Sequence, residues 1–463
     1  MLFHSPEFFA FLLAVVALFY AAPLRYRRIV LLAASYAFYM FWNAKFIVLI
    51  WTLTLIDYAA GLWINRVSQN RRKLVLLVSL CANLGLLGFF KYYNFFASSA
   101  AAVLGLPRNS FFIDVILPLG ISFHTFQSMS YVIDVYRGEQ QPIRNLLDYA
   151  LFISFFPQLV AGPIVRAREF FGNLYHWRRP SMEEFQSASL LFLCGLAKKM
   201  IFADQFAKVA DPYFEHVYAN PGLVTAWTAT LAFAFQIFFD FSGYTDMAIA
   251  CAKFLGFDLP ENFARPYLAA SITEFWRRWH ISLSRWLRDY LYIPLGGNRK
   301  GPVRTYLNLL VTMLLGGLWH GANWTFIAWG AWHGALLAAE RAFGIQTNRN
   351  SRWTVFTPLR ATLTFALVVI GWVLFRAPGI REAAFVYGQM FSGRGGVSLL
   401  TPGHMMLIVF SLAFAIFEEK RSVLARFPRL PVPVQAAALT VLLLCFEIFS
   451  ATDQRLPFIY FQF

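Results

Sequence analysis

Long apolar runs recur from one end of this sequence to the other, and they limit most strongly how the chain can fold. The clearest runs occupy residues 8–22, 74–93, 146–165, 187–205, 223–255, 303–319, 323–344, 356–375, 403–418 and 434–450. One crossing of a bilayer by a helix takes about 20 apolar residues. Several runs are shorter or more polar than that, so we expect about ten to twelve crossings with some re-entrant pieces. The expected fold class is an all-α polytopic membrane protein.

Composition supports this interpretation and bears on the number of domains. The 463 residues are 59% hydrophobic and only 14% charged, whereas soluble domains average about 25% charged residues. No polar region separates the apolar runs, so we expect a single integral-membrane domain over residues 1–463. No Lys or Arg precedes the first run, so the basic start of a cleavable signal peptide is missing and a retained first span is expected.

The distribution of basic residues predicts an orientation. Arginines at positions 25, 27 and 28 follow the first run, and a second basic group lies between Arg66 and Lys73, whereas the turn between them carries only Lys45. Cytoplasmic loops carry an excess of Lys and Arg. We therefore expect the basic loops in the cytoplasm and the N-terminus on the opposite side of the membrane.

The stretch from Leu117 to Val135 is expected to be irregular. Pro118, Gly120, His124 and Gln127 interrupt its apolar pattern, and irregular backbone within a membrane is tolerated where protein surrounds it. His124 is a candidate pore-lining or site-supporting residue, although packing against a neighbouring helix is the simpler role.

Several chemistries are poorly supported by the motifs. The four cysteines lie at positions 81, 194, 251 and 445 without CxxC spacing or paired histidines, so we expect no metal site and no disulfide framework. The sequence has neither a Gly-x-Ser-x-Gly elbow nor a Walker-type glycine loop. A serine hydrolase or an ATP-driven pump is therefore not indicated, and no bound cofactor is expected.

The region 236–334 concentrates the residues that can carry chemistry. It contains His280, His320 and His333, three of the eight histidines in the chain. A helix drawn from residue 276 onward gathers its aromatic and leucine side chains in one arc about 100° wide, with arginines opposite. That arc consists of Trp276, Trp279, Leu283, Trp286, Leu287 and Tyr290. This pattern predicts an interfacial helix whose aromatic face lies in the bilayer, with His280 at the border of its two faces.

His320 lies at the end of an apolar run, between glycines. Gly316, Gly317 and Gly321 flank it, which indicates a helix break or the close approach of another segment. An ionisable residue in such a membrane position is a functional-site hypothesis by default, although a packing role remains open. A neutral imidazole can accept a proton near neutral pH, so a general base is the chemistry that fits.

The net charge of +16 is explained mostly by cytoplasmic loops, and no nucleic-acid partner is needed. A denser group of basic residues nevertheless faces only Asp289 between positions 277 and 304. It comprises Arg277, Arg278, Arg285, Arg288, Arg299, Lys300 and Arg304. Such a cluster can bind the phosphates of coenzyme A or an acidic carrier protein, and anionic lipid headgroups are the competing ligand.

A buried polar group interrupts the apolar run 223–255. Asp240, Ser242, Tyr244 and Asp246 lie there, and carboxylates inside a membrane need partners. We expect them to support the interior of the protein. His333, Trp319 and Asn323 are candidates for the same supporting role beside His320.

Three motifs together carry a family resemblance. They read FDFSGYTDMA, ENFARPYLAASITEFWRRWHISLSRWLRDYLYIPLGGNRKG and GGLWHGANWTFIAWGAWHG, and they resemble the membrane-bound O-acyltransferases, the MBOAT family. The resemblance extends to MLFHSPEF, LPLGISFHTFQ, LVAGPIVR and the terminal FIYFQF. It is strongest to the bacterial branch that contains the alginate O-acetyltransferase membrane subunit and the teichoic acid D-alanyl transferase.

The resemblance implies roles for two histidines at a central tunnel. His320 matches the family's catalytic histidine, and His280 matches its second, upstream position. We expect His320 to act as general base and His280 to position or polarise the thioester or its leaving group. Whether His320 instead takes the acyl group itself stays open.

The resemblance also implies a function. It implies O-acyl transfer, most simply of an acetyl group from acetyl-CoA to a polysaccharide hydroxyl outside the membrane, through a periplasmic acetyltransferase partner as in alginate O-acetylation. D-alanyl transfer from a carrier protein and a non-enzymatic transporter or channel are the alternatives.

Overall fold

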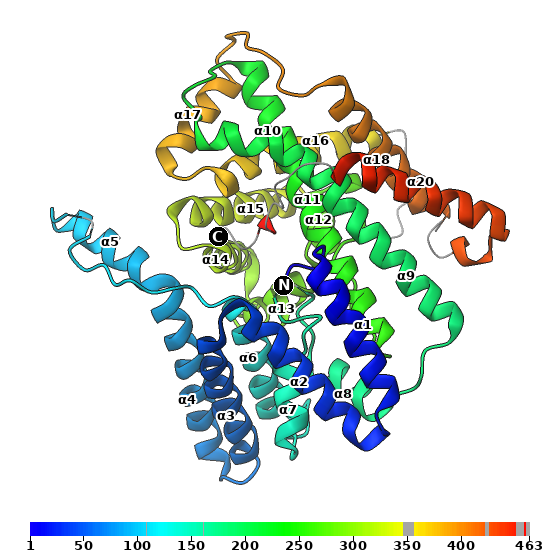
Figure 1. Ribbon diagram of the computed structural model, residues 1–463. Helices are drawn as coiled ribbons and strands as arrows, with labels where there is room; N and C mark the ends of the chain where they lie inside the picture. Colours follow the sequence, from blue (N-terminus) through cyan, green and yellow to red (C-terminus); the bar gives the residue numbers. More distant parts are fainter. Residues whose placement is uncertain (108, 161, 346–355, 422–425, 451–457, 460–463) are drawn as a thin grey trace. The chain divides into compact units, whose positions relative to one another are not determined.

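The computed structural model describes residues 1–107, 109–160, 162–345, 356–421, 426–450 and 458–459. Within these residues every regular element is a helix, as the apolar runs predict (Figure 1). The chain divides into two compact units, residues 1–188 with 248–260, and residues 189–247 with 261–463. The single domain expected from the sequence stays a prediction, and each unit is described by itself.

The first unit is built on the helices before residue 188. They are α1 (Pro6–Ala21), α2 (Leu24–Asn43), α3 (Ile47–Ile64), α4 (Gln69–Leu87), α5 (Tyr93–Val103), α6 (Ile121–Arg137), α7 (Leu146–Ser154), α8 (Ala167–Tyr175) and the start of α9 (Met182–Ala197). Helices α3 and α4 lie side by side and both contact α6 (Figure 1). Asp57 of α3 is fully buried and accepts hydrogen bonds from two residues of α4. Ser79 Oγ donates to it over 2.5 Å, and Asn83 Nδ2 donates to it over 2.9 Å. A carboxylate inside a candidate span thus has the partners that it needs.

The expectation of an irregular stretch from Leu117 to Val135 is wrong over most of its length. Gly120, with φ of +72°, begins the regular helix α6, and a Cβ there would lie 2.5 Å from the Leu159 carbonyl oxygen. The polar side chains of α6 bind backbone carbonyls of residues 152–159: His124 Nε2 lies 3.0 Å from Leu159 O, and Gln127 Nε2 donates to Phe152 O. His124 therefore has the packing role.

The second unit contains the remaining helices. They are α10 (Asp204–Glu215), most of α11 (Leu223–Phe254), α12 (Ile272–Arg278), α13 (Ile281–Leu287), α14 (Gly301–His320), α15 (Trp324–Ala342), α16 (Thr357–Arg376), α17 (Ile380–Met390), α18 (Pro402–Arg421) and α20 (Val432–Ser450). A three-residue connection turns the chain from α14 into α15, and α15 in turn contacts α16 and α12. His320 ends α14 and Arg376 ends α16, and just beyond these ends Asn323 Nδ2 donates to Pro378 O.

Seven segments of the described chain are long and apolar enough to cross a membrane. They are Leu24–Ile64, Gln69–Val103, Met182–Glu215, Leu223–Phe254, Thr357–Arg376, Pro402–Glu419 and Val432–Phe449. Helix α1 is a shorter apolar helix, and the 41 residues of Leu24–Ile64 contain two helices, α2 and α3. The multi-pass architecture expected from the apolar runs is confirmed.

Candidate functional site

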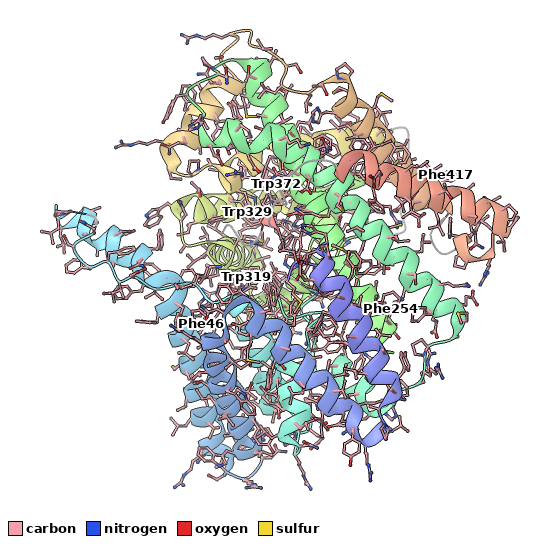
Figure 2. All side chains as sticks on the ribbon, viewed as in Figure 1. Phe46, Phe254, Trp319, Trp329, Trp372 and Phe417 are labelled. Atoms are coloured by element: carbon pink, nitrogen blue, oxygen red, sulfur yellow. The ribbon has the colours of Figure 1, made fainter. Side chains whose placement is uncertain are left out.

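His320 is the last residue of α14 and is buried among aromatic rings. Its ring centroid lies 5.0 Å from that of Trp319, 5.2 Å from Trp329 of α15 and 5.2 Å from Phe375 of α16. Trp329 stacks on Trp372 of α16 at 5.9 Å between ring centroids, and Figure 2 labels these two residues side by side. The surroundings of His320 are therefore largely aromatic.

Glycines let α14 and α15 approach each other closely beside His320. A Cβ on Gly317 would lie 2.2 Å from Phe326 O, and one on Gly330 would lie 2.2 Å from Met313 O. Gly321, just after His320, has extended backbone, and a Cβ there would overlap the Phe326 ring. The glycines around this histidine thus mark both a helix end and a close approach, as the sequence indicated.

His280 lies at a break that the sequence did not reveal. Helix α12 ends at Arg278, Trp279 is extended, and His280 has φ of +42°, a left-handed conformation that is uncommon for a residue other than glycine. Helix α13 begins at Ile281 and continues as a π-helical turn over Arg288–Tyr292. The continuous interfacial helix predicted from residue 276 is therefore wrong.

The aromatic arc of that predicted helix is nevertheless shared by the two short helices. All six of its members, Trp276, Trp279, Leu283, Trp286, Leu287 and Tyr290, are buried inside the protein. The periodicity identified the buried face correctly, but this face packs on other helices instead of lying in lipid. Leu287, for example, lies where a Cβ on Gly316 would touch it.

Asn262 holds the break together from a segment 18 residues upstream. Its Oδ1 accepts from the Ser282 backbone N–H over 3.1 Å and from Ser282 Oγ over 2.9 Å, and it lies 3.2 Å from His280 Nδ1. Two backbone bonds flank these contacts: Ile281 N–H donates to Asn262 O, and Ala264 N–H donates to Arg278 O. The polar groups exposed by the break are thus satisfied within the protein.

These contacts define the tautomer of His280. A backbone N–H can only donate, so the atom that receives the Ser282 N–H is the amide oxygen, and Nδ1 of His280 must be the donor toward it. The proton of the neutral ring is then on Nδ1, and Nε2 carries the lone pair. Full burial lowers the pKa of His280 from 6.5 to about 3, so the ring is neutral at pH 7.

The structure brings the two histidines together. The ring centroids of His280 and His320 are 6.3 Å apart, and Trp319 lies next to both. A buried base, a neutral second imidazole and a dry aromatic wall can activate a hydroxyl for attack on an acyl group.

His333 and His320 both pack against the Trp329 ring. His333 packs face to face on Phe275 and edge to face against Trp276 and Trp329. Neither of its ring nitrogens has a hydrogen-bond partner among the described residues. Asn323 begins α15, where its Oδ1 accepts from the Thr325 N–H, so it supports the turn that follows His320.

The polar group of α11 is buried and partly ion-paired. Asp240 Oδ1 lies 2.9 Å from Lys199 Nζ, and Asp246 Oδ2 lies 2.5 Å from Lys198 Nζ. Ser242 is fully buried. Asp240 also accepts from the backbone N–H of Ile459, and Phe458 stacks on Tyr244 at 4.7 Å between centroids. The terminal FIYFQF motif thus contributes to this unit through its first two residues, and its last four lie outside the described residues.

Most members of the basic cluster have exposed side chains, and two of its arginines are in ion pairs. Arg278 is ion-paired with Glu274 and Glu419, and Arg288 with Asp289. The side chains of Arg277, Arg285, Arg299, Lys300 and Arg304 are exposed. The exposed members are the ones placed to meet a large anion.

Comparison with known proteins identifies the family. Residues 31–377 match the model of the membrane-bound O-acyltransferase family, a range that contains both histidines and all of 236–334. The chain belongs to the membrane-bound O-acyltransferase family. It is therefore an enzyme of the O-acyltransferase class, as its motifs predicted.

Curated relatives in this family differ in the acceptor that their names give. The chain is 43% identical to the probable alginate O-acetylase AlgI of Pseudomonas putida, with all of both chains covered. It is 40% identical to the peptidoglycan O-acetyltransferase of Helicobacter pylori, over 86% of this chain and 81% of the relative. The teichoic acid D-alanyltransferase of Bacillus subtilis is 30% identical over 56% of this chain and 68% of the relative.

Some residues of this O-acyltransferase site were missed or underrated from sequence. Lys198 and Lys199 lie inside an apolar run, which could have indicated that they pair with the carboxylates of α11. Arg376, next to Phe375, pairs with Asp211 over 2.9 Å, and Asn262 is a partner of His280 itself. No local signal joins Asn262 to His280, because the contact depends on the path of the chain between them.

Proposed function

We propose that this enzyme transfers an acetyl group from acetyl-CoA, bound from the cytoplasmic side, to a hydroxyl on the other side of the membrane. The observation that carries the proposal is the pair of buried imidazoles, His280 and His320, 6.3 Å apart in an aromatic site. Membership of an O-acyltransferase family supplies the reaction class.

His320 acts as the general base. A thioester already has a good leaving group, so the enzyme mainly has to align it with the hydroxyl and remove one proton. The hydroxyl proton moves to the His320 ring, and the oxygen attacks the carbonyl carbon to form the new C–O bond. The C–S bond then breaks, and the departing thiolate takes the proton from His320.

His280 positions the reacting oxygen. With its proton on Nδ1 and a strongly lowered pKa, its Nε2 is a hydrogen-bond acceptor. It therefore aligns the acceptor hydroxyl by accepting from it, rather than polarising the thioester by donation.

The exposed basic residues bind the phosphates of the acyl donor on the cytoplasmic side. Arg299, Lys300 and Arg304 lie at the start of α14 and His320 at its end, about 30 Å away along a helix of 20 residues. Such a concentration of basic residues favours the cytoplasmic side for the start of α14. Phosphates bound by the exposed cluster, with the acyl arm extended toward His320, fit this polarity.

The acceptor is a polysaccharide. Alginate and peptidoglycan appear in the names of the relatives that cover most of this chain, and alginate is our first choice. We place the enzyme in the inner membrane of a bacterium, with its N-terminus in the periplasm and a periplasmic acetyltransferase as the partner that passes the acetyl group on. D-alanyl transfer has less support, because those relatives match only 56% of the chain.

The test uses the purified full chain in nanodiscs with acetyl-CoA that carries a radiolabelled acetyl group. Thioester loss and label transfer to alginate oligomers are followed with and without a periplasmic acetyltransferase. His320→Ala should lower turnover about 10²–10⁴-fold while acetyl-CoA still binds. His216→Ala, a change at an exposed histidine of the same unit, serves as the control and should leave turnover unchanged.

Two results would contradict parts of the proposal. Retained turnover by a well-folded His320→Ala variant would remove the general base. Turnover of a D-alanyl carrier-protein thioester but never of acetyl-CoA would replace the donor.

A further inference from the structure

We propose that Asn262 is a catalytic residue, whose Nδ2 donates a hydrogen bond to the thioester carbonyl oxygen as that oxygen becomes negatively charged. The inference deepens the proposed function and rests on it, because it names the group that binds the donor at the reacting bond. Asn262 lies at the end of the loop that follows α11, upstream of both short helices.

The orientation of the Asn262 amide is fixed by its surroundings. Because the Ser282 backbone N–H identifies Oδ1, the other amide atom is the nitrogen, and the side chain cannot be turned over without placing two N–H donors against each other. The backbone of Asn262 is held as well, since its carbonyl accepts from Ile281 N–H. The amide is therefore rigid before any substrate binds.

The Asn262 side-chain nitrogen is a buried donor without an acceptor among the described residues. Asn262 is 1% exposed, and its Nδ2 has no hydrogen-bond partner among the described residues. A buried donor without a partner costs about 1–3 kcal/mol, and such groups are rare in native proteins outside functional sites. A rigid, fully buried asparagine with this defect is explained if a bound ligand supplies the acceptor.

The donor belongs to a residue in direct contact with His280. Asn262 Oδ1 lies 3.2 Å from His280, whose ring is 6.3 Å from that of His320. The ligand acceptor must be an oxygen that can enter a dry, aromatic site, and the acetyl carbonyl meets this description. Asparagine side chains serve as oxyanion donors in other acyl-transfer enzymes, where the loss of one donor lowers kcat about 10²–10³-fold.

The role of this donor in the reaction is electrostatic. When the hydroxyl oxygen attacks the carbonyl carbon, the C=O electron pair moves to the carbonyl oxygen, and the N–H of Asn262 stabilises the charge there. When the C–S bond breaks, the pair returns to form the ester C=O, and the thiolate takes the proton held by His320. The amide itself neither gains nor loses a proton.

The decisive experiment reads the hydrogen bond without relying on turnover. Acetyl-CoA with ¹³C at the acetyl carbonyl is bound to the full-length His320→Ala variant in nanodiscs, and the ¹³C-minus-¹²C infrared difference spectrum isolates the C=O stretch. We expect a lower stretch frequency than for acetyl-CoA in water-free solvent. Adding Asn262→Ala should raise the frequency, because alanine cannot donate from this position, and Asn262→Asp should raise it at a pH at which the new carboxyl group is ionised.

Asn262→Asp separates the proposed role from a purely positioning one. An ionised aspartate keeps an oxygen for Ser282 and His280 but has no hydrogen to donate. In the enzyme that retains His320, both variants should lower kcat about 10²-fold with little change in the KM for acetyl-CoA. Asn308→Ala, in which a buried asparagine with a partnered Nδ2 is lost from α14, is the matched control and should leave the frequency unchanged.

The experiment distinguishes a failure of the role proposed for Asn262 from a failure of the proposed function. A bound carbonyl whose frequency does not change when Asn262→Asp is introduced overturns the inference and leaves the proposed function standing. The absence of any bound carbonyl band in the His320→Ala variant overturns the proposed donor, and the inference with it. Should Asn262→Ala fail to fold, Asn262→Asp decides by itself, since it preserves the acceptor that holds the break.

Discussion

The two histidines of the site are held in different ways. His280 lies at a helix break with φ of +42°, and polar contacts from Asn262 fix its orientation. His320 ends a regular helix, where the rings of Trp329 and Phe375 fix its position and glycines allow α14 and α15 to approach. Polar contacts to a distant segment are prominent around His280, and the close approach of two helices is prominent around His320.

Because of this difference, we expect different kinds of substitution to disturb the two histidines. Hydrogen bonds around a break respond to the loss or ionisation of a single polar group. A packed helix pair responds instead to added volume, because a backbone atom cannot move aside as a flexible side chain can. The following variants test each dependence.

Gly317→Ala should have the largest effect. Its Cβ would lie 2.2 Å from Phe326 O, so α14 and α15 must separate, at a cost of about 1–3 kcal/mol or more. The end of α14, and His320 with it, would shift. We expect a lower midpoint of thermal unfolding together with a loss of acyl transfer.

Two other glycines calibrate this result. A Cβ on Gly316 would meet only the end of the Leu287 side chain at 3.0 Å, so Gly316→Ala should be milder. Gly388 in α17 has nothing within 4 Å, so Gly388→Ala should stabilise by about 0.5–1 kcal/mol. Equal midpoints of thermal unfolding for the three variants would mean that the close approach of α14 and α15 does not determine the position of His320.

The next largest effect should be a loss of folding stability at acidic pH that arises from His280. The pKa of His280 is about 3 in the folded protein and about 6.5 in an unfolded chain. Between these values the unfolded chain binds a proton that the folded protein does not, so stability is full above pH 6.5 and falls as the pH drops toward 3. At pH 5.5 the loss from this residue is about 1 kcal/mol.

His280→Asn provides the comparison for the pH experiment, because asparagine does not titrate. The thermal midpoint of the wild type should fall more than that of the variant between pH 7.5 and pH 5.5. If the thermal midpoints of the two proteins fell equally with pH, the folded protein would not lower the pKa of His280.

The smallest effect concerns the backbone at residue 280. Asparagine tolerates the left-handed conformation, whereas in alanine it costs about 1–2 kcal/mol. His280→Ala should therefore be less stable than His280→Asn by about 1 kcal/mol, measured as thermal unfolding in detergent at pH 7.5. The opposite order would mean that the break relaxes when the imidazole is lost.

Sequence patterns predicted the helical membrane fold and the buried faces, because both depend on local spacing. The arc from Trp276 to Tyr290 is buried as a set, and the glycines around His320 mark a helix end. Such features repeat along a few turns of chain, and periodicity detects them.

Contacts between distant segments explain what the sequence did not reveal. The break at His280 is stabilised by Asn262, and α6 stays regular through His124 because carbonyls of residues 152–159 satisfy its polar side chains. Neither partner is visible in the local pattern. The π-helical turn over Arg288–Tyr292 is likewise set by tertiary packing rather than by propensity.

The two backbone bonds across the break, from Ile281 N–H to Asn262 O and from Ala264 N–H to Arg278 O, have a consequence for side reactions. They pair backbone groups at the break within the protein, so a helix can be interrupted beside the two histidines without leaving those groups to water. In the proposed mechanism, fewer open polar groups beside the thioester leave fewer sites from which water could hydrolyse it.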